Sequence, residues 1–578
     1  MNFSHVAQLF ETIETTSSRT AKTDLLASCL KDMSPHEAQI VTYISMGDLY
    51  SSYENVQFNI ADKGLIEIIA VLLDKSSSNI LQEYKDAGDL GDVIQHGWHG
   101  IDNGLSIDQV YNDLVVCANL HGNGSTELKL HNLVALLKQV DSLSAKYIIR
   151  MITKTLRLGF SDMTLLDAFS CMAVGNKSIR PMLENAYNIC ADLGLVAKNL
   201  KQDGIAAVEK MTSIVGVPVR PSAAERLATS QEVVDKLGTC AAQPKLDGFR
   251  LQIHLDKTGP TPIVKFYSRN LIDMSNMFPD IAQQIIQLPV QNLICEGEAI
   301  GYDLETDTFM QFQETVKRKR KHNIEQASSD IPLRVYLFDL LYLNNESTLG
   351  LTHEQRRIKL GQVVASMHNS DVFLIDEKIV STGKELEDYF LQTIGAGLEG
   401  LVVKKQDAIY QPGKRNFNWI KLKRQTGQKL GDTIDTVVLG YYVGQGRRTY
   451  LGIGAFLVGV YNPETDAFES VAKVGTGMTD IEWIDLKIRC DNVMIQKKLD
   501  NVSVAKSLYP DVWVNPEIVC EIRADDITKS PLHTAGKTDE NLGFALRFPR
   551  FVQYRIDKSA HDATTSKELA HLYEIQYQ

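Results

Sequence analysis

The apolar residues of this 578-residue chain change their spacing twice, and those changes limit the folds it can adopt. Apolar positions first recur at helical spacing, then alternate with polar residues as in strands, and finally form short strands between glycine-rich turns. A chain of this length is also too long for a single core. We therefore predict a multidomain α+β protein with an all-helical domain, a sheet-containing domain and a small β-barrel, over residues 1–214, 215–424 and 425–578.

Composition and cysteine usage indicate a protein of the cell interior. The eight cysteines are scattered without a Cys-x-x-Cys pair, which is typical of reduced, buried thiols. No apolar run approaches the length of a membrane span, and residues 1–5 lack the pattern of a secretory signal. We expect an intracellular protein that binds no membrane and is cytoplasmic or nucleoid-associated, or nuclear if its host is eukaryotic. The net charge of −12 does not exclude nucleic acid, because phosphate binding depends on where cations cluster.

The segment Lys245-Leu246-Asp247-Gly248 precedes a strand of alternating apolar residues. Lys-x-Asp-Gly is the arrangement with which nucleotidyl transferases place a nucleophilic amine against a nucleotide α-phosphate. A lysine amine attacks phosphorus only when neutral, and its ordinary pKa is about 10.4, so the site must favour loss of the proton. Neighbouring cations do so, and Arg250, Lys421 and Lys423 are candidates. An isolated motif of this kind would instead be an exposed turn lysine.

Residues further along the chain have the chemistry that a nucleotide site needs. Phe338 lies in an almost continuous apolar run and can stack on a base, although such a residue alone is more often core. The guanidinium groups of Arg250 and Arg269 suit phosphate and ribose oxygens. Glu298 and Glu399 offer the oxygen ligands that Mg²⁺ prefers, and that ion neutralises charge in phosphoryl transfer.

A cationic stripe is predicted in the helical domain. Lys146, Arg150, Lys154 and Arg157 follow helical spacing beside apolar residues, which fits either DNA phosphate contacts or a solvated helix face. The turn that follows exposes backbone N–H groups ahead of a new helix, and Ser161 there can bind a phosphate.

Taken together and in order, the motifs resemble those of the ATP-dependent DNA ligases of archaeal and eukaryotic replicative type. The helical stripe and its turn resemble the DNA-binding domain of that family. The motifs are Lys245-Leu246-Asp247-Gly248, Ser268-Arg269-Asn270, Glu296-Gly297-Glu298, Phe338-Asp339, Glu399-Gly400, Trp419-Ile420-Lys421-Leu422-Lys423 and Arg547-Phe548-Pro549-Arg550.

The resemblance implies three domains: a helical DNA-binding domain, a nucleotidyltransferase (ATP-grasp-like adenylation) domain of antiparallel sheets and helices, and a C-terminal OB-fold β-barrel. It implies that ATP forms a lysyl-AMP at Lys245, that AMP moves to the 5′-phosphate of a nick, and that the 3′-hydroxyl displaces it, in DNA replication, repair and recombination. It also implies Mg²⁺ bound by Glu298 and Glu399, and nucleotide contacts from Gln243, Arg250, Arg269, Glu298, Phe338, Arg415, Lys421 and Lys423. The expected partners are nicked double-stranded DNA and a sliding clamp, with the ligase itself a monomer.

The chain departs from the family at Gln243, where a glutamate usually contacts the adenine amino group. A glutamine amide offers both a carbonyl acceptor and an NH₂ donor, so it can meet either purine. We therefore expect ATP as the main donor with relaxed discrimination against GTP. Ile556 also replaces a residue that is usually polar in the last motif.

Three other readings remain to be separated from a ligase. An mRNA-capping guanylyltransferase shares the Lys-x-Asp-Gly core but should lack the helical domain. A DNA-binding scaffold built on a decayed transferase is disfavoured by the retained lysines and glutamates. An NAD-dependent ligase is disfavoured because the four-cysteine zinc module of that family is absent from the sequence.

Overall fold

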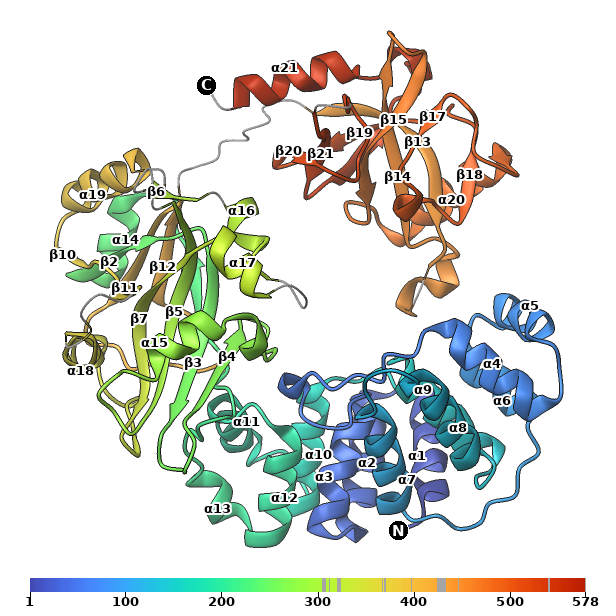
Figure 1. Ribbon diagram of the computed structural model, residues 1–578, viewed down its shortest axis with the longest axis horizontal. Helices are drawn as coiled ribbons and strands as arrows, with labels where there is room; N and C mark the ends of the chain where they lie inside the picture. Colours follow the sequence, from blue (N-terminus) through green and yellow to red (C-terminus); the bar gives the residue numbers. More distant parts are fainter. Residues whose placement is uncertain are drawn as a thin grey trace. The chain divides into compact units, whose positions relative to one another are not determined.

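The computed structural model describes residues 1–576, except 304–307, 311, 320–323, 366, 368–370, 397, 424–432, 445 and 539–540. Contacts divide the chain into two compact units, Met1–Arg424 and Gln425–Gln578 (Figure 1). Within the described residues, no helix combines the length and apolar character needed to cross a bilayer.

The N-terminal part of the first unit is entirely helical and surrounds one hydrophobic core (Figure 1). Phe10, Leu114 and Phe169 are fully buried there. Polar residues begin the helices, as where the Ser34 side chain and Glu37 form a capping box at the start of α3. The helices are α1 (Phe3–Thr15), α2 (Arg19–Asp32), α3 (Pro35–Ser45), η1 (Ser52–Glu54), α4 (Asp62–Leu73), α5 (Ser77–Ala87), α6 (Leu90–Gly97), α7 (Ile107–Ala118), α8 (Ser125–Leu137), α9 (Ser142–Ile152), α10 (Asp162–Val174), α11 (Arg180–Ile189), α12 (Leu193–Asp203) and α13 (Ile205–Glu209).

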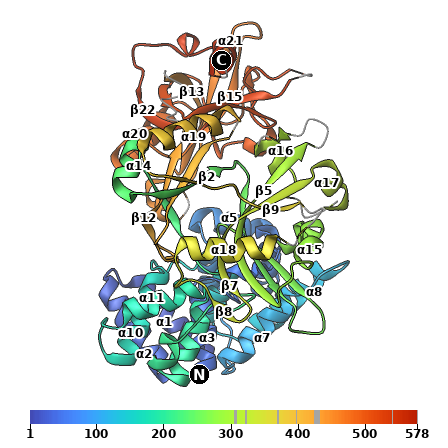
Figure 2. The ribbon, with the colours of Figure 1, turned by 90° about the vertical axis from the view of Figure 1, so that its left-hand side faces the viewer.

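The rest of the first unit contains a five-stranded sheet with the order β1-β12-β11-β2-β10. Its pairings are antiparallel apart from β1 with β12. Helices α14 and α19 pack side by side over one face (Figure 2) and share a core with its apolar side chains. The elements are β1 (Ala223–Arg226), α14 (Ser230–Leu237), β2 (Cys240–Lys245), β10 (Lys378–Val380), α19 (Gly383–Gly395), β11 (Gly400–Lys405) and β12 (Arg415–Lys423).

A seven-stranded sheet lies against the other face of the five-stranded one. Its main order is β4-β3-β5-β7-β8, with β6 on β5 and β9 on β7. Lys404 of β11 donates from Nζ to the Phe338 carbonyl of β7 at 2.8 Å, which joins the two sheets. The elements are β3 (Phe249–Asp256), β4 (Ile263–Ser268), η2 (Ser275–Met277), α15 (Pro279–Ile285), β5 (Asn292–Asp303), β6 (Thr308–Phe309), α16 (Phe312–Val316), α17 (Ile324–Asp330), β7 (Leu333–Leu343), β8 (Glu346–Ser347), α18 (His353–Val364) and β9 (Val372–Leu374).

The second unit is rich in strands, as predicted. A curled sheet with the order β16-β18-β13-β14-β15-β17 continues from β13 through β19 to β22, and β20 pairs with β21. Its core contains fully buried Trp483 of α20. The elements are β13 (Ile434–Tyr442), η3 (Gly446–Leu451), β14 (Ala455–Asn462), β15 (Ala467–Val474), α20 (Asp480–Asn492), β16 (Met494–Ile495), β17 (Val502–Ser503), η4 (Lys506–Leu508), β18 (Val512–Val514), β19 (Val519–Arg523), β20 (Asp526–Ser530), β21 (Gly543–Arg547), β22 (Arg550–Tyr554), η5 (Ala560–Asp562) and α21 (Ser566–Gln576).

The predicted fold class is confirmed as a sequence of three parts: helical, mixed sheet and helix, and β-rich. One local prediction was wrong. Helix α9 ends at Ile152, so Lys154 and Arg157 lie beyond it, at φ values of +54° and +58°. Left-handed backbone conformations cannot continue a right-handed helix. The four cations of the predicted stripe are therefore not on one helix.

Candidate active site

One face of the five-stranded sheet carries most of the predicted site. Apolar residues of β11 and β12 point into the core against α14 and α19, so the alternate residues face the seven-stranded sheet. Lys245 and Lys423 both pair with Gly400, and Gln243 and Lys421 both pair with Val402. Two cross-strand rows on the same face therefore bring together residues that are nearly 180 positions apart in the sequence.

Glu399 links the two lysines of the first row. It forms ion pairs with the Lys245 amine and, at 2.9 Å, with Lys423 Nζ, and its backbone N–H donates to the Lys245 carbonyl at 3.2 Å. Burial acts to raise the pKa of Glu399, but the charges of the two lysines outweigh it and lower that pKa. The sequence analysis named cations as neighbours of Lys245 but did not foresee the carboxylate that lies next to its amine.

The sequence analysis expected a cluster of cations around Lys245, but the structure shows such a cluster around Lys421 of the second row. Burial and the charges of Arg415, Lys423, Arg269 and Arg226 together lower the pKa of Lys421. Arg226 was missed because it lies in β1, which reaches Lys421 only through the parallel pairing of β1 with β12. No local pattern around Arg226 signals that contact.

Arg250 and Phe338 lie together on the facing sheet. The Arg250 guanidinium is 5.4 Å from the centre of the Phe338 ring, and Nη2 donates to Glu296 Oε2 at 2.6 Å. Its Nη1 donates to the Ser222 carbonyl at 3.1 Å. Tyr410 donates its hydroxyl to the same Glu296 oxygen at 3.0 Å. The buried Glu296 therefore positions Arg250, a role that the sequence analysis did not assign to it.

Glu298 pairs with Arg250 across β3 and β5 and belongs to the same charge cluster. Burial raises the pKa of its carboxyl to about 7, although Lys245 and Arg250 act in the opposite direction and Glu399 adds to the rise. Carboxyl groups whose pKa is shifted by burial and by specific charged neighbours are typical of functional sites.

The glycine of the Lys-x-Asp-Gly motif is required by close packing. A Cβ atom on Gly248 would lie 2.2 Å from the carbonyl oxygen of Ala299 on β5. Real Cβ atoms do not come that close to a backbone oxygen, so a side chain would push the turn away from β5. The turn that follows Lys245 is thereby held against the strand that carries Glu298.

Gln243 is buried, and its side chain is hydrogen-bonded to a carboxylate from a distant segment. Its Nε2 donates to Glu377 Oε2 at 2.7 Å, and His353 Nε2 lies 2.8 Å from the same oxygen. Neither Glu377 nor His353 was identified from the sequence, because each lies more than 100 positions from Gln243 and in no recognisable motif.

The predicted DNA-binding stripe divides into a buried and an exposed half. Lys146 and Arg150 are 4% and 1% exposed, which corrects the expected surface stripe. Their nearest groups are the carboxylates of four acidic residues, which neutralise them inside the helical part. The acidic residues are Glu11, Glu14, Asp89 and Asp92.

Lys154 and Arg157 lie nearer the surface. Lys154 Nζ is 2.8 Å from Asp48, and Arg157 Nε is 3.1 Å from Asp89. Ser161 is exposed directly before α10, and its side chain makes no capping hydrogen bond. The hydroxyl of Ser161 is therefore not committed to the helix that it precedes.

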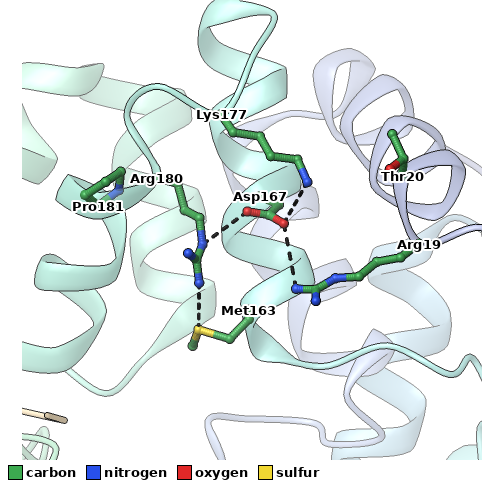
Figure 3. A pocket seen from close by; sticks show the side chains of 7 residues that line it. All are labelled: Arg19, Thr20, Met163, Asp167, Lys177, Arg180 and Pro181. Atoms are coloured by element: carbon green, nitrogen blue, oxygen red, sulfur yellow. Dashed lines mark hydrogen bonds and ion pairs between the residues drawn. The ribbon is translucent and has the colours of Figure 1, made fainter.

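A second cationic cluster lies beside this turn and was not predicted. Figure 3 shows Arg19, Lys177 and Arg180 converging on Asp167, with Met163 at the base of the same pocket. The nitrogen–oxygen distances to Asp167 are 3.8, 2.9 and 3.1 Å. Asp167 and Glu184, which lies 3.4 Å from Arg180, supply two negative charges for these three cations, so one positive charge is left unmatched. Lys177 and Arg180 are neighbours in the sequence, but Arg19 comes from α2, so sequence spacing did not reveal the whole cluster.

The carboxylates available for a divalent metal are few. Among the residues that the structure describes, no group of three or more His, Cys, Asp or Glu forms a metal-binding cluster. Mg²⁺ often uses one or two carboxylates and completes its shell with water and substrate phosphates. Glu298 and Glu399, whose charges interact, fit that limited donor set.

Comparison with known proteins gives three consecutive family matches. The model described as DNA ligase N terminus matches residues 2–170, and that described as ATP dependent DNA ligase domain matches residues 221–423. The model described as ATP dependent DNA ligase C terminal region matches residues 449–558. The N-terminal match separates the chain from mRNA-capping guanylyltransferases, which were expected to lack that domain.

Individual relatives extend over the whole chain. The protein named Probable DNA ligase from Dictyoglomus turgidum is 41% identical, covering 100% of this chain and 98% of its own. DNA ligase 2 from Thermofilum pendens is 38% identical, covering 99% and 97%. The solved structure named Pmar-Lig_Pre shares the fold, with a TM-score of 0.55 and 17% identity over 95% of this chain and 99% of its own. Because full-length relatives reach this level of identity, the chain belongs to the ATP-dependent DNA ligase family, as its motifs predicted.

Proposed function

We propose that this ligase seals nicks in duplex DNA through a lysyl-AMP formed at Lys245. The observation that carries the proposal is the single sheet face on which Lys245, Lys421 and Lys423 lie together, opposite Phe338 and Arg250. That face offers a nucleophile, unmatched positive charge for phosphates and an aromatic ring for a base.

The chemistry runs in three displacements at phosphorus. Lys245 Nζ attacks the α-phosphorus of ATP, so an N–P bond forms and the bond to pyrophosphate breaks. An oxygen of the 5′-phosphate at a nick then attacks the same phosphorus and releases the lysine. The 3′-hydroxyl finally attacks the 5′-phosphorus, forms the phosphodiester and releases AMP.

We assign the nucleotide contacts to side chains that line this face or act on it electrostatically. Lys421, with its lowered pKa, and the arginines around it would contact the phosphates, and Phe338 would stack on the base. The proposed nucleotide-contacting residues are Gln243, Arg250, Arg269, Glu298, Phe338, Arg415, Lys421 and Lys423.

Glu298 and Glu399 would hold Mg²⁺. When bound, the ion supplies neutralisation of the charge that develops on the phosphates. The charge of Glu399 acts to raise the pKa of Glu298, and a cation held between the two carboxylates would relieve that repulsion.

We assign the DNA contacts of the helical part to its exposed cations. Lys154, Arg157 and Ser161 remain in the proposal, whereas Lys146 and Arg150 are themselves buried and paired with carboxylates of the helical part. The Arg19, Lys177 and Arg180 cluster joins them because it carries unmatched charge beside the same turn (Figure 3). Binding through such contacts weakens steeply with salt.

The proposal also covers the domain organisation, oligomeric state, partners and location of the protein. We propose domain junctions near residues 214 and 424, a monomeric ligase, and a sliding clamp as a partner beyond nicked DNA. Action inside the cell, in the cytoplasm or nucleoid or in a nucleus, follows from the location of the DNA substrate.

The proposal is tested by labelling the protein with ATP that carries an α-phosphate label. We expect an acid-labile label on Lys245, its loss in Lys245→Ala, and its transfer to nicked DNA added afterwards. Lys405→Ala is a matched control, because Lys405 is a more exposed lysine on the neighbouring strand β11. Labelling of Lys245→Ala to the parent level would contradict the assignment.

A further inference from the structure

The contact between Gln243 and Glu377 is built into the sheet. Glu377 directly precedes β10, and the pairing of Lys378 with Ala242 places Glu377 across from Gln243 at the edge of the sheet. The Nε2–Oε2 distance is 2.7 Å, and the Gln243 side chain is 2% exposed. The fold therefore gives Gln243 a fixed carboxylate neighbour from a distant segment.

Glu377 acts on Gln243 only as an acceptor. His353 Nε2 lies 2.8 Å from Glu377 Oε2, and Arg357 Nε lies 3.8 Å from Oε1. Burial acts to raise the pKa of Glu377, but the hydrogen bond from His353 and the nearby cations lower it below its ordinary value. An ionised carboxylate has no hydrogen to donate, so Gln243 must present its NH₂ group to Glu377. The carbonyl oxygen Oε1 is then the atom that Gln243 offers to a ligand.

The position of Gln243 suits contact with a nucleotide base. It lies two residues before Lys245 on the same face of β2, a separation of about 7 Å along a strand. Phe338 lies near the same end of the site, because Lys404, two residues beyond the Val402 that pairs with Gln243, donates to the Phe338 carbonyl. A nucleotide with its α-phosphate at Lys245 and its base at Phe338 therefore brings the base edge toward Gln243.

We infer that Glu377 is a positioning residue that makes the ligase select adenine over guanine, by holding the Gln243 carbonyl toward the base. This inference rests on the proposed function. Adenine presents an amino donor where guanine presents a carbonyl acceptor. Oε1 of Gln243 accepts from the adenine amino group but would face the guanine carbonyl as a second acceptor.

Reversing the amide to suit guanine is costly because of Glu377. It would place Oε1 of Gln243 against an ionised carboxylate, with no hydrogen between the two oxygens. Leaving a buried acceptor without a donor costs about 1–3 kcal/mol, or roughly 5- to 150-fold in an equilibrium. The relaxed discrimination expected from Gln243 alone is thereby replaced by a preference for ATP.

The inference is tested by the ratio of Lys245 labelling rates with ATP and GTP in the full-length protein. Glu377→Gln keeps the size of the side chain but can accept or donate, so Gln243 is free to reverse. We expect the ATP-to-GTP ratio to fall about tenfold or more in Glu377→Gln. Asp376→Asn is the matched control, since it removes a carboxylate one residue away on an exposed side chain and should leave the ratio unchanged.

A double exchange provides a second measurement. Gln243→Glu alone places two carboxylates side by side and should impair labelling by either nucleotide. Combining Gln243→Glu with Glu377→Gln restores one donor between the pair and leaves a carboxylate oxygen for adenine, so ATP preference should return. A structural effect of Glu377 alone would not produce that recovery.

The outcomes separate the inference from the function on which it rests. A parent protein that ATP does not label at Lys245 would contradict both. A labelled parent with an unchanged ATP-to-GTP ratio in folded Glu377→Gln would overturn the inference alone. If Glu377→Gln does not fold, the double variant decides: a ratio near the parent value supports the inference, and a ratio near one overturns it.

Discussion

Two groups of basic residues that the sequence presents as equally functional have opposite surroundings in the structure. Arg150 of α9 is 1% exposed and is paired with the carboxylates of Glu14, Asp89 and Asp92. Lys421 of β12 is surrounded instead by other cations, and burial together with those charges lowers its pKa. The Arg150 charge is balanced by carboxylates of the protein itself, whereas the positive charge around Lys421 exceeds that of its neighbours and would be balanced by an anionic ligand.

We infer from the comparison that the balance of charge around a cation is a better guide to a ligand-binding role than its spacing in the sequence. Buried, fully paired cations hold helices together and have no remaining charge for a substrate. Cations that exceed their carboxylate neighbours attract phosphates. The cluster around Asp167 belongs to the second class by this criterion, although no motif marks it.

The largest expected effect is on stability, in Arg150→Ala. Removing Arg150 leaves several buried or half-buried carboxylates facing one another, which should lower the free energy of unfolding by about 3–5 kcal/mol. Thermal unfolding followed by circular dichroism measures the loss. Arg157→Ala is the control, because Arg157 is 33% exposed and shares only Asp89, so about 1 kcal/mol or less is expected. If Arg150→Ala lost DNA affinity but kept its stability, Arg150 would be a DNA-binding residue and not a structural one.

A smaller effect concerns the pH dependence of stability at Glu298. Its pKa of about 7 in the folded protein lies above its ordinary value of 4.5, so between these values the folded chain keeps a proton that the unfolded chain has lost. That contribution to stability is complete below about pH 4.5 and is lost as the pH rises through 7.

Without nucleotide or metal, Glu298→Gln should therefore match the parent near pH 5 and exceed it near pH 8 by roughly 1–3 kcal/mol. Melting temperatures at the two pH values measure the difference. Glu346→Gln, an exposed carboxyl on β8, should show no such dependence. If Glu298→Gln and the parent had the same pH dependence of melting temperature, the pKa of Glu298 would not be raised in the folded protein.

The smallest effect is expected on DNA affinity at the surface cluster of Figure 3. Lys177→Gln should weaken duplex binding a few-fold at all sequences and reduce the salt dependence by about one phosphate contact. Titrations at several salt concentrations measure the slope. Lys63→Gln, an exposed lysine of α4, should leave the slope unchanged. The same slope for both variants would remove the Asp167 cluster from the DNA-binding surface.

Local sequence patterns predicted the parts of the site that depend on strand geometry. In the motif from Trp419 to Lys423 the two lysines alternate with apolar residues, and the structure places both lysines on one face of β12, because successive strand residues point to opposite sides. The order of three structural parts was also predictable, since helices and strands bury apolar residues with different periods.

The counter-charges were not predictable, because they come from distant segments. Arg150 meets acidic residues 58 to 136 positions away, and Gln243 meets Glu377 at a separation of 134. The helical spacing of apolar residues also predicted a helix that continues beyond Ile152, because the left-handed backbone at Lys154 has no counterpart in the pattern of apolar residues.

The sequence also contains a basic run at residues 317–321. Its Arg318 is fully buried and forms an ion pair with Asp280, while residues 320 and 321 lie outside the described residues.

The tight fit of Gly248 against Ala299 has a consequence for how the reaction can be timed. In the proposed mechanism Lys245 is the nucleophile, and the clamped turn fixes its backbone, so only its flexible side chain can move toward the triphosphate and later the nick. Substitutions at residue 248 should therefore slow lysyl-AMP formation and AMP transfer to the nick alike. Substitutions in parts of the chain that bind only the triphosphate or only the nick should slow one of these two steps.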